Sequence, residues 1–524
     1  MKKKAKSTYR KIENKRSEPL YLIMSGVGVG ISAGLVCVLY RFMLSIAEGT
    51  LFKVIDIVKG DPLKTTLWLV AVAAMGVIVS LIIKWAPMAS GSGIPQVSGE
   101  IKGYVSPNWW KVLIAKLTGG SITVLAGLSL GREGPSVQLG GMAAKGVAKM
   151  TKADRTTEIR MISCGAGAGL AAAFNAPLAG IMFVLEEIHH TFDKSLLCMG
   201  IVSAVVADFV SKIFFGQDTI FHYETSQIPL RQYWILIVLG IVLGLLGAGY
   251  NIIMSYGQDL FKKFNKIPQT IRFAIVFFIS GIVGLYVPRI LGGGHSMVEF
   301  LINDHPAISV MIFLLFAKFI FGAFSAGSGA PGGTLYPLLI LGTYIGAIFG
   351  DISINILGLP ADIWQEFVVL SMAGFFASIV RAPITGVVLV FELTGNMDSL
   401  LPLVVVCLIS YTVADMCGVS PIYSTLLEKF LTNNKDTETP INTGEKVLQT
   451  FVIPTGSPLR NKKIADIEWG KHCLIVSVER EERAITPKGD TVLKEGDELI
   501  MMISQRYFAK DKRKIEKIIK GASE

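Results

Sequence analysis

Apolar runs of about 20 residues recur along most of the sequence, and this is the length that an α-helix needs to cross the hydrocarbon core of a bilayer. Of the 524 residues, 51% are hydrophobic and only 17% are charged. A chain with so many apolar runs and so few charges is typical of a protein that crosses a membrane repeatedly. The sequence therefore predicts an all-α polytopic membrane protein.

Several of the expected membrane segments are too short to cross a bilayer perpendicularly. Short segments interrupted by Gly or Pro need protein or a water-lined cavity around them, because lipid cannot satisfy their freed backbone groups. The 54 glycines also allow helices to approach closely. We expect segments near residues 20–45, 66–85, 108–125, 133–149, 158–173, 176–189, 194–216, 232–256, 271–288, 308–326, 334–350, 364–380, 383–394 and 399–416.

Charge is concentrated at the N-terminus, where the first 18 residues hold eight Lys or Arg and two Glu. The positive-inside rule predicts that residues 1–17 form a cytoplasmic tail. Because so much of the net charge of +10 flanks the membrane, anionic lipid is the expected partner and nucleic acid is not. The six cysteines contain no CxxC pair, so neither a metal site nor a disulfide framework is expected.

The composition changes after residue 430. A polar linker at 432–444 leads into residues 445–524, where strand-like runs at 447–453, 474–478 and 498–503 alternate with turns. This part is predicted to be a small cytoplasmic α+β domain.

The membrane part contains an internal repeat. The sequence APLAGIMFVLE at residues 176–186 matches APITGVVLVFE at 382–392, and GREGP at 131–135 echoes GTLYP at 333–337 with nearly the same separation. Composition is the alternative explanation, since membrane segments rich in Gly, Ala and Pro resemble one another. Because order and separation are kept, we expect two homologous halves, about 18–216 and 232–431. Halves with broken helices in matching positions indicate a substrate site at the midplane.

GREGP and GTLYP are glycine-rich turns that lead into helices. The free N–H groups and the dipole at such helix starts favour an anion. Two starts can meet at one point from opposite sides only if their helices run antiparallel, so the repeat is expected to be inverted and the transported ion negative.

Glu133 lies inside the first of these turns. A bare carboxylate at that depth costs about 2.5 to 3.5 kcal/mol, but among N–H groups it can occupy the anion site itself, and protonation releases it. Arg132 is not expected to pair with Glu133, because adjacent residues of a helix do not face each other. The alternative is that Glu133 pairs structurally with a distant lysine.

These motifs resemble the signature elements of the ClC family of chloride channels and chloride/proton exchangers. GSGIP at 91–95, GREGP at 131–135, AGSGAPGGTLYP at 326–337 and Tyr423 in PIYS follow the family order. The resemblance covers roughly residues 18–430. It implies a ClC-type inverted-repeat helical fold, no cofactor, and a homodimer in which each subunit has its own anion pathway.

The resemblance also implies the site residues. Chloride is expected to be bound by hydroxyl and main-chain N–H groups, and Glu133 corresponds to the external gating glutamate. Ser at the position of Ser92 accompanies chloride rather than nitrate or fluoride in the family. The family's third motif is usually GxFxP, and Leu335 replaces its aromatic residue. Because the backbone N–H does the binding, the site is expected to be kept. The implied chloride-binding residues are Ser92, Gly93, Glu133, Gly134, Thr334, Leu335 and Tyr423.

Glu187, in FVLEEIHH, stands where the family's exchangers carry a glutamate that takes protons from the cytoplasmic side. In the internal repeat Glu186 matches Glu392, whereas Glu187 matches Leu393. The alternative is an ordinary interfacial carboxylate beside two histidines. The resemblance therefore predicts chloride/proton antiport. A passive voltage- or pH-gated chloride channel and an exchanger of nitrate or fluoride remain alternatives.

Residues 445–524 are similar to the TrkA-C (RCK-C) regulatory domain, through IPTGSPLRNKKIADIEW, CLIVSVERE and DTVLKEGDELIM. Such domains dimerise, and some bind small ligands such as nucleotides. This sequence has no phosphate loop, so a purely dimer-stabilising role is an equal alternative.

Two other classes of protein fit less well. Converging helix starts repel the cations of a potassium transporter, and no TVGYG filter is present. An intramembrane hydrolase using Ser92 or Ser328 with His295 lacks a nucleophile motif such as GxSxG, so the protein is not expected to be an enzyme. His295, in GGGHS, is expected to be a loop residue. We expect a multi-pass protein of the plasma membrane with both termini in the cytoplasm.

Overall fold

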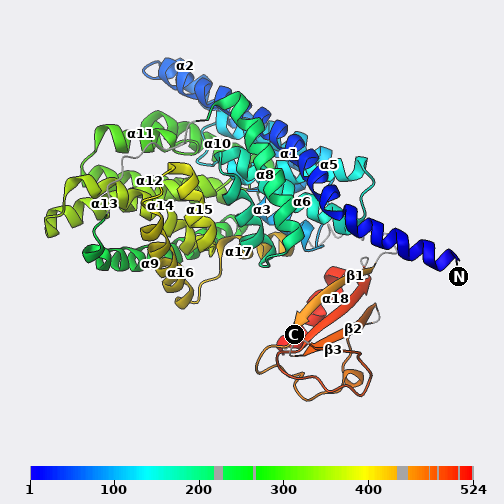
Figure 1. Ribbon diagram of the computed structural model, residues 1–524. Coiled ribbons are helices and arrows are strands. Elements are labelled where there is room, and N and C mark those ends of the chain that lie inside the picture. Colours follow the sequence, from blue (N-terminus) through cyan, green and yellow to red (C-terminus); the bar gives the residue numbers. More distant parts are fainter. Residues whose placement is uncertain are drawn as a thin grey trace. The chain divides into compact units, whose positions relative to one another are not determined.

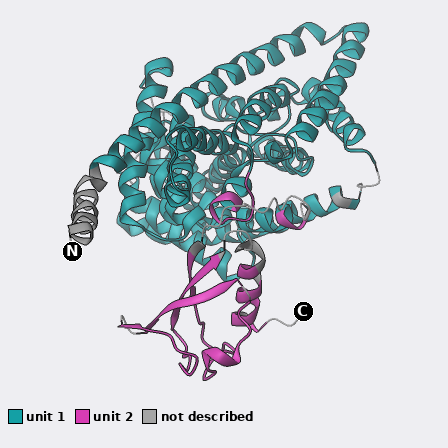
Figure 2. Ribbon diagram, turned by 90° about the vertical axis from the view of Figure 1, so that its right-hand side faces the viewer, with its two compact units in different colours: residues 1–98, 107–430 teal, residues 99–106, 431–524 magenta. Residues whose placement is uncertain are grey.

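The computed structural model describes residues 2–217, 228–263, 267–433, 446–470, 472–480, 483–504 and 508–521. Most of the expected linker at 432–444 therefore lies outside the described residues. The chain forms two compact units, which Figure 2 colours separately: residues 1–98 with 107–430, and residues 99–106 with 431–524.

The first unit is helical, and Figure 1 follows it from blue through green to yellow. Its first half consists of α1 (Lys2–Val58), α2 (Pro62–Trp85), η1 (Pro87–Ala89), α3 (Ile94–Ile101), α4 (Trp109–Leu125), α5 (Glu133–Met150), α6 (Arg155–Phe174), α7 (Pro177–Phe183), the π-helical turn η2 (Val184–His189) and α8 (Lys194–Phe215).

The second half repeats this order of long and short helices. It consists of η3 (Leu230–Gln232), α9 (Tyr233–Lys263), α10 (Gln269–Tyr286), η5 (Pro288–Ile290), α11 (His295–Asp304), α12 (Ile308–Gly327), α13 (Leu335–Leu357), η6 (Ala361–Ile363), α14 (Trp364–Val380), α15 (Pro383–Thr394) and α16 (Leu400–Met416), and α17 (Ile422–Asn433) follows. His295 is the first residue of α11, so its expected position in a loop was wrong; the preceding glycines supply the turn.

Helix packing confirms the repeat. Helix α5 packs on α6 as α13 packs on α14, and α1 packs on α8 as α9 packs on α16. Two helices pack on their own counterparts across the halves, α2 on α10 and α7 on α15. Contact between an element and its own counterpart is what a two-fold relation produces.

Eight of the described helices are long and apolar enough to cross a bilayer, by length and composition. At 1.5 Å per residue, the 8 residues of α3 and the 7 of α7 cover far less than the roughly 30 Å of a hydrocarbon core. The expectation that some segments are too short to cross is confirmed. The eight candidate spans are Leu20–Val58, Pro62–Trp85, Lys194–Phe215, Leu230–Phe261, Gln269–Tyr286, Ile308–Gly327, Leu335–Leu357 and Ala361–Val380.

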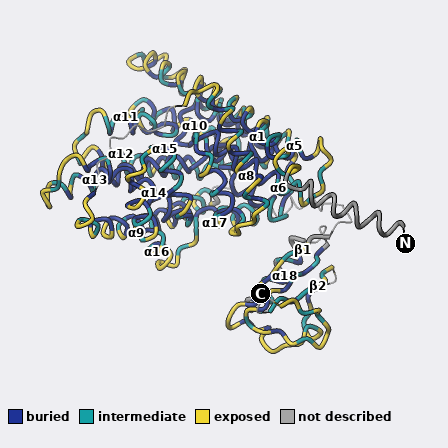
Figure 3. Tube along the Cα trace, in the orientation of Figure 1, coloured by how far each residue is buried: buried dark blue, intermediate teal, exposed yellow. Residues whose placement is uncertain are grey.

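The centre of the helical unit is formed by α5, α6, α13 and α14, whose residues are mostly buried (Figure 3). Glycines bring these helices into backbone contact. A Cβ on Gly140 of α5 would overlap the carbonyl oxygen of Gly165 in α6, and one on Gly346 of α13 would overlap that of Phe367 in α14. This close packing holds the starts of α5 and α13 firmly in place.

The second unit contains an antiparallel sheet in the order β1-β4-β2-β3, formed by β1 (Lys446–Val452), β2 (Cys473–Arg480), β3 (Arg483–Ile485) and β4 (Glu498–Ser504). Helix α18 (Phe508–Lys520) places Ile515 and Ile519 in one buried cluster with Leu499 and Met501 of the sheet. The three expected strands and the small α+β class are confirmed, whereas the short β3 was not predicted.

Among the ion pairs of this second unit, the pair of Arg480 with Asp497 has a fully buried carboxylate. Arg480 donates to both carboxylate oxygens of Asp497 at 2.7 Å, and the Asp497 side chain has no exposed surface. Burial opposes ionisation, but the hydrogen bonds from Arg480 and the Lys494 N–H hold the pKa of Asp497 below its ordinary value of 3.8. The stabilisation from this pair is therefore complete above the ordinary aspartate pKa and is lost as the pH falls through the lower folded value.

Arg480→Met is expected to lower the free energy of opening of β2 and β4 by about 3 kcal/mol near neutral pH, because it leaves a buried carboxylate without its cation. Hydrogen exchange of the β2 and β4 amides in the full-length protein measures this. Arg483→Met, on an exposed position of β3, is the control and should change stability by less than about 0.5 kcal/mol. Equal effects of the two variants would show that the pair contributes nothing.

Candidate functional site

The starts of α5 and α13 meet through a reciprocal pair of backbone hydrogen bonds. Gly131 and Gly333 each donate an N–H to the carbonyl oxygen of the other at 2.7 Å, as an isolated antiparallel bridge. Because the two segments run in opposite directions here, the helices that follow them leave in opposite directions. The bridge confirms that the repeat is inverted and that GREGP and GTLYP meet at one point.

The GSGIP motif reaches the same point. A Cβ on Gly134 would lie 2.9 Å from the carbonyl oxygen of Ser92 and 3.1 Å from the Cα of Gly333, so only glycine fits between them. Gly93 has a φ of +100°, which also favours glycine. Three motifs far apart in the sequence therefore touch at the starts of α3, α5 and α13.

Buried lysines hold the turns that precede α3 and its counterpart in the second half, α11. Lys116 of α4 donates to the carbonyl oxygens of Ala89 (3.0 Å) and Gly91 (2.6 Å), before α3. Lys318 of α12 makes the equivalent bonds to Ile290 (3.0 Å) and Gly292 (2.8 Å), before α11. Neither lysine was predicted to support the site. Their separation in the sequence equals that of Gly131 and Gly333. This equal spacing could have identified the two lysines as counterparts in the internal repeat.

Tyr423 and Thr334 bring two hydroxyl groups to the site. Tyr423, at the start of α17, is 3% exposed, and its ring packs edge-on against Phe183 with centroids 6.1 Å apart. Its hydroxyl lies near that of Thr334, yet within the described residues neither oxygen has a hydrogen-bond partner of normal geometry. Buried hydroxyls are normally paired, so two unpaired donors side by side fit an anion that accepts from them.

Glu133, the first residue of α5, is 1% exposed. Its carboxylate faces the backbone N–H groups of Arg132 and Tyr336, at the starts of both central helices. Oε1 lies 3.8 Å from the Arg132 Nε, whereas Oε2 has no hydrogen-bond partner within the described part of the chain. The expectation that Arg132 does not pair with Glu133 was wrong: Arg132 is the N-cap and lies outside the regular helix, where the rule for adjacent residues does not apply.

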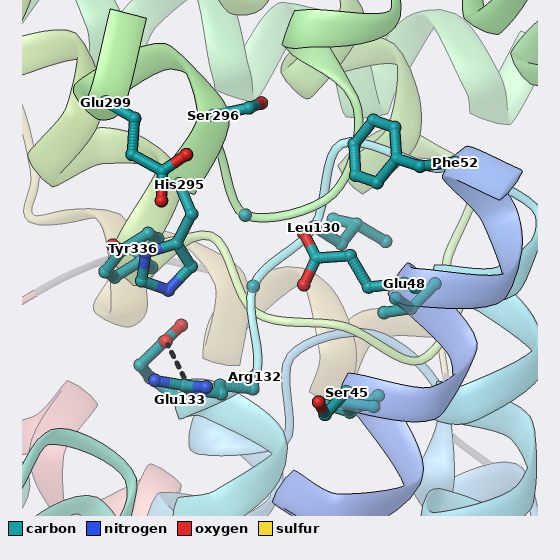
Figure 4. A pocket seen from close by; sticks show the side chains of 15 residues that line it. Ser45, Glu48, Phe52, Leu130, Arg132, Glu133, His295, Ser296, Glu299 and Tyr336 are labelled. Atoms are coloured by element: carbon teal, nitrogen blue, oxygen red, sulfur yellow. Dashed lines mark hydrogen bonds and ion pairs between the residues drawn. The ribbon is translucent and has the colours of Figure 1, made fainter. Parts of the chain in front are cut away.

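A cavity of about 420 Å³ opens beside Glu133. It is lined by residues of α1, α5, α11 and α13, and Figure 4 shows Glu48 of α1 and His295 of α11 approaching it from opposite sides, with Arg132 and Glu133 below. The cavity connects the buried carboxylate with the exposed Glu299, which lines it as well. Glu133 is thus the innermost of several carboxylates along one passage.

The two neighbouring glutamates of FVLEEIHH have different surroundings. Glu186 accepts hydrogen bonds at 3.1 and 2.7 Å from the first N–H groups of α15, and Glu392 accepts bonds at 3.0 and 2.8 Å from those of α7. This exchange of helix caps ties the halves together. Glu187 is the second glutamate of the motif. It is 6% exposed in η2 and lies within electrostatic range of Tyr423, as Glu133 does.

Two family models match the chain. Residues 75–415 match the voltage-gated chloride channel family, and residues 448–510 match the TrkA-C domain. A protein of Vibrio parahaemolyticus named H(+)/Cl(-) exchange transporter ClcA is 35% identical over 444 residues, which cover 82% of this chain and 94% of that protein. The protein of the same name from Salmonella arizonae is 33% identical over 438 residues, covering 80% and 91%.

Solved structures of similar fold include proton-coupled antiporters. A slow cyanobacterial Cl-/H+ antiporter superposes with a TM-score of 0.73 at 29% identity, covering 80% of this chain and 99% of that one. A CLC-type fluoride/proton antiporter has the same fold, with a TM-score of 0.64 at 20% identity, covering 78% and 97%. With the family model spanning most of the helical unit, this multi-pass membrane protein belongs to the voltage-gated chloride channel (ClC) family and carries a C-terminal TrkA-C domain.

Proposed function

We propose that this protein exchanges chloride for protons across the membrane, with Glu133 as the external gate and Glu187 as the internal proton acceptor. The observation that carries the proposal is the buried Glu133 carboxylate at the meeting point of two antiparallel helix starts, where backbone N–H groups favour an anion. The relatives named as H(+)/Cl(-) exchange transporters support the same reaction.

Chloride is bound, in this proposal, by donors from separate motifs. The hydroxyls of Ser92 and Tyr423 and the N–H groups of Thr334 and Leu335 point to one anion, while Gly93 and Gly134 let the backbone approach closely. The Tyr423 and Thr334 hydroxyls, which have no hydrogen-bond partner of normal geometry among the described residues, support this assignment. Because the Leu335 side chain is not the binding group, its replacement of an aromatic residue leaves the ligand set unchanged.

Exchange follows from competition for this site. An ionised Glu133 occupies the region of the N–H groups and excludes chloride. Protonation removes the charge, so chloride enters as the acid moves away. Release of that proton toward Glu187 returns the carboxylate to the site, and the two ions thus move in opposite directions. Passive conduction is the alternative, in which Glu133 gates the pathway without passing its proton on.

The proposal includes the orientation of the protein in the membrane and its assembly as a dimer. The basic residues 1–17 lie in the cytoplasm against anionic lipid of the plasma membrane, and the C-terminal domain lies on the same side. The protein forms a homodimer in which each subunit keeps its own pathway. Residues 18–431 form the transport domain and 432–444 the linker.

Proton movement against the proton gradient tests the proposed chloride/proton exchange. A chloride gradient imposed on proteoliposomes should drive protons against their own gradient, and a passive channel would carry chloride without doing so. Replacement of chloride by nitrate or fluoride in the same assay tests the anion, because a higher coupled rate with either would overturn the chloride assignment.

Truncation after Asn434 is expected to leave a folded dimer that transports chloride at nearly the full-length rate, because the helical unit has its own buried core and retains Tyr423. A ligand of the TrkA-C domain can alter transport only through different affinities for two states of the whole protein. Chloride flux of both forms, with and without nucleotides, measures this. A stable but inactive truncated protein would place the domain within the transport machinery.

A further inference from the structure

A histidine and a tyrosine form a pair in the wall of the cavity beside Glu133. Tyr336 Oη and His295 Nδ1 are 2.8 Å apart, and the two rings lie with centroids 4.7 Å apart. Tyr336 belongs to the first turn of α13, whose start faces Glu133, and His295 is the first residue of α11. The pair therefore joins the start of α11 to the start of α13. The start of α13 is also the one that bridges to α5.

The imidazole lies in the wall of the same cavity as the Glu133 carboxylate. His295, Tyr336 and Glu133 line the same cavity, and Figure 4 shows the His295 ring directed toward the Glu133 carboxylate. Because Nδ1 bonds to Tyr336, Nε2 is the ring nitrogen that can exchange a proton with cavity water.

We propose that His295 passes protons between the cavity and Glu133, and that Tyr336 is the positioning residue that holds its ring. This rests on the proposed function of Glu133 as the gate. With hydrogen on Nδ1 bonded to the tyrosine oxygen, Nε2 takes a proton from a hydronium ion and leaves water. The imidazolium then gives that proton to the Glu133 carboxylate and becomes neutral again, so one proton is transferred and no other group changes.

The charged groups around the pair favour this direction of transfer. The cations near the ring repel imidazolium, so a proton stays on the ring only briefly, and the negative charge of Glu133 attracts it onward. The carboxylates along the cavity attract protons toward the ring. The groups that share the cavity with His295 are Glu48 of α1, Arg132 and Glu133 at the start of α5, Glu299 of α11 and Tyr336 of α13, and Arg41 of α1 and Lys318 of α12 lie within electrostatic range of the ring.

His295→Gln tests the relay, because glutamine keeps a polar side chain beside Tyr336 but does not titrate. Proton uptake driven by a chloride gradient should fall about a hundredfold, the lower end of the range for loss of a positioned proton-transfer group. The deficit should be greatest at high pH on the cavity side and should shrink as that side is acidified, since abundant protons then reach Glu133 directly. The pH is varied on each side separately.

Two further variants separate relay from packing. Tyr336→Phe keeps the ring stacking and removes only the hydroxyl, so it should give a smaller deficit with the same pH dependence. Ser296→Ala, in the same cavity, should match wild type. In His295→Ala, added imidazole should restore proton uptake. Unchanged proton uptake and unchanged pH dependence in His295→Gln, or no rescue by imidazole, would overturn the proposal.

Failure of the His295 relay can be distinguished from failure of the proposed chloride/proton exchange. If wild-type protein moves no protons uphill, the exchange proposal fails, and the relay is then judged by the dependence of chloride flux on cavity-side pH. A dependence that His295→Gln shifts to lower pH supports the relay in a proton-gated channel. A wild-type flux with no such dependence overturns the relay as well.

Discussion

Glu133→Gln is expected to abolish proton coupling while leaving chloride flux at or above the wild-type rate. Glutamine mimics the protonated acid in shape and lacks the charge that competes with chloride, so the pathway stays open and no proton is carried. The dependence of chloride flux on pH should disappear with it. Simultaneous recording of chloride efflux and proton uptake from proteoliposomes measures the ratio, which should fall to zero within error.

Ser45→Ala is the control, since Ser45 lines the same cavity but is exposed and carries no charge that attracts protons. It should keep the wild-type ratio of protons to chloride. Full coupling in Glu133→Gln would remove Glu133 from the mechanism and return it to a structural ion pair with Arg132.

Glu187→Gln is expected to stop proton movement while passive chloride flux continues, because an internal proton acceptor serves only the proton branch. Unlike Glu133→Gln, this variant should keep the effect of pH on the Glu133 side, where the gate still titrates. Chloride flux with pH varied on each side separately distinguishes the two variants.

The neighbouring Glu186→Gln provides the contrast for Glu187. Because Glu186 caps α15, its loss should lower stability by about 0.5–2 kcal/mol, the range for losing a helix cap, without changing the coupling ratio. If Glu186→Gln uncouples transport and Glu187→Gln does not, the assignment of the internal proton acceptor is wrong.

The helical architecture could be read from local pattern. Lengths of apolar runs predicted the spans, and the matched segments at 176–186 and 382–392 predicted the repeat before any packing was known. These signals are local because a bilayer imposes the same length on every spanning helix and an internal duplication copies its motifs. The same matching separated Glu186 from Glu187, and the reciprocal caps of α7 and α15 explain the difference.

Other parts of the site could not be predicted from the sequence, because they depend on side-chain contacts. The ion pair of Arg132 with Glu133 was not expected, because the sequence did not reveal that Arg132 is the N-cap. His295 was expected in a loop, yet it begins α11 and bonds to Tyr336, 41 residues further along the chain. Neither contact has a signal in sequence spacing.

Runs and spacings along the chain were enough to predict the family, the two inverted halves and the motifs that carry an anion pathway. What these motifs contact was known only once the chain was seen folded. The bridge of Gly131 with Gly333, the neighbouring Tyr423 and Thr334 hydroxyls, and the cavity that joins His295 to Glu133 all arise where helix starts converge from distant segments. Which side chains are buried, and which groups they contact, depends on how these distant segments pack together. No local sequence pattern contains that information.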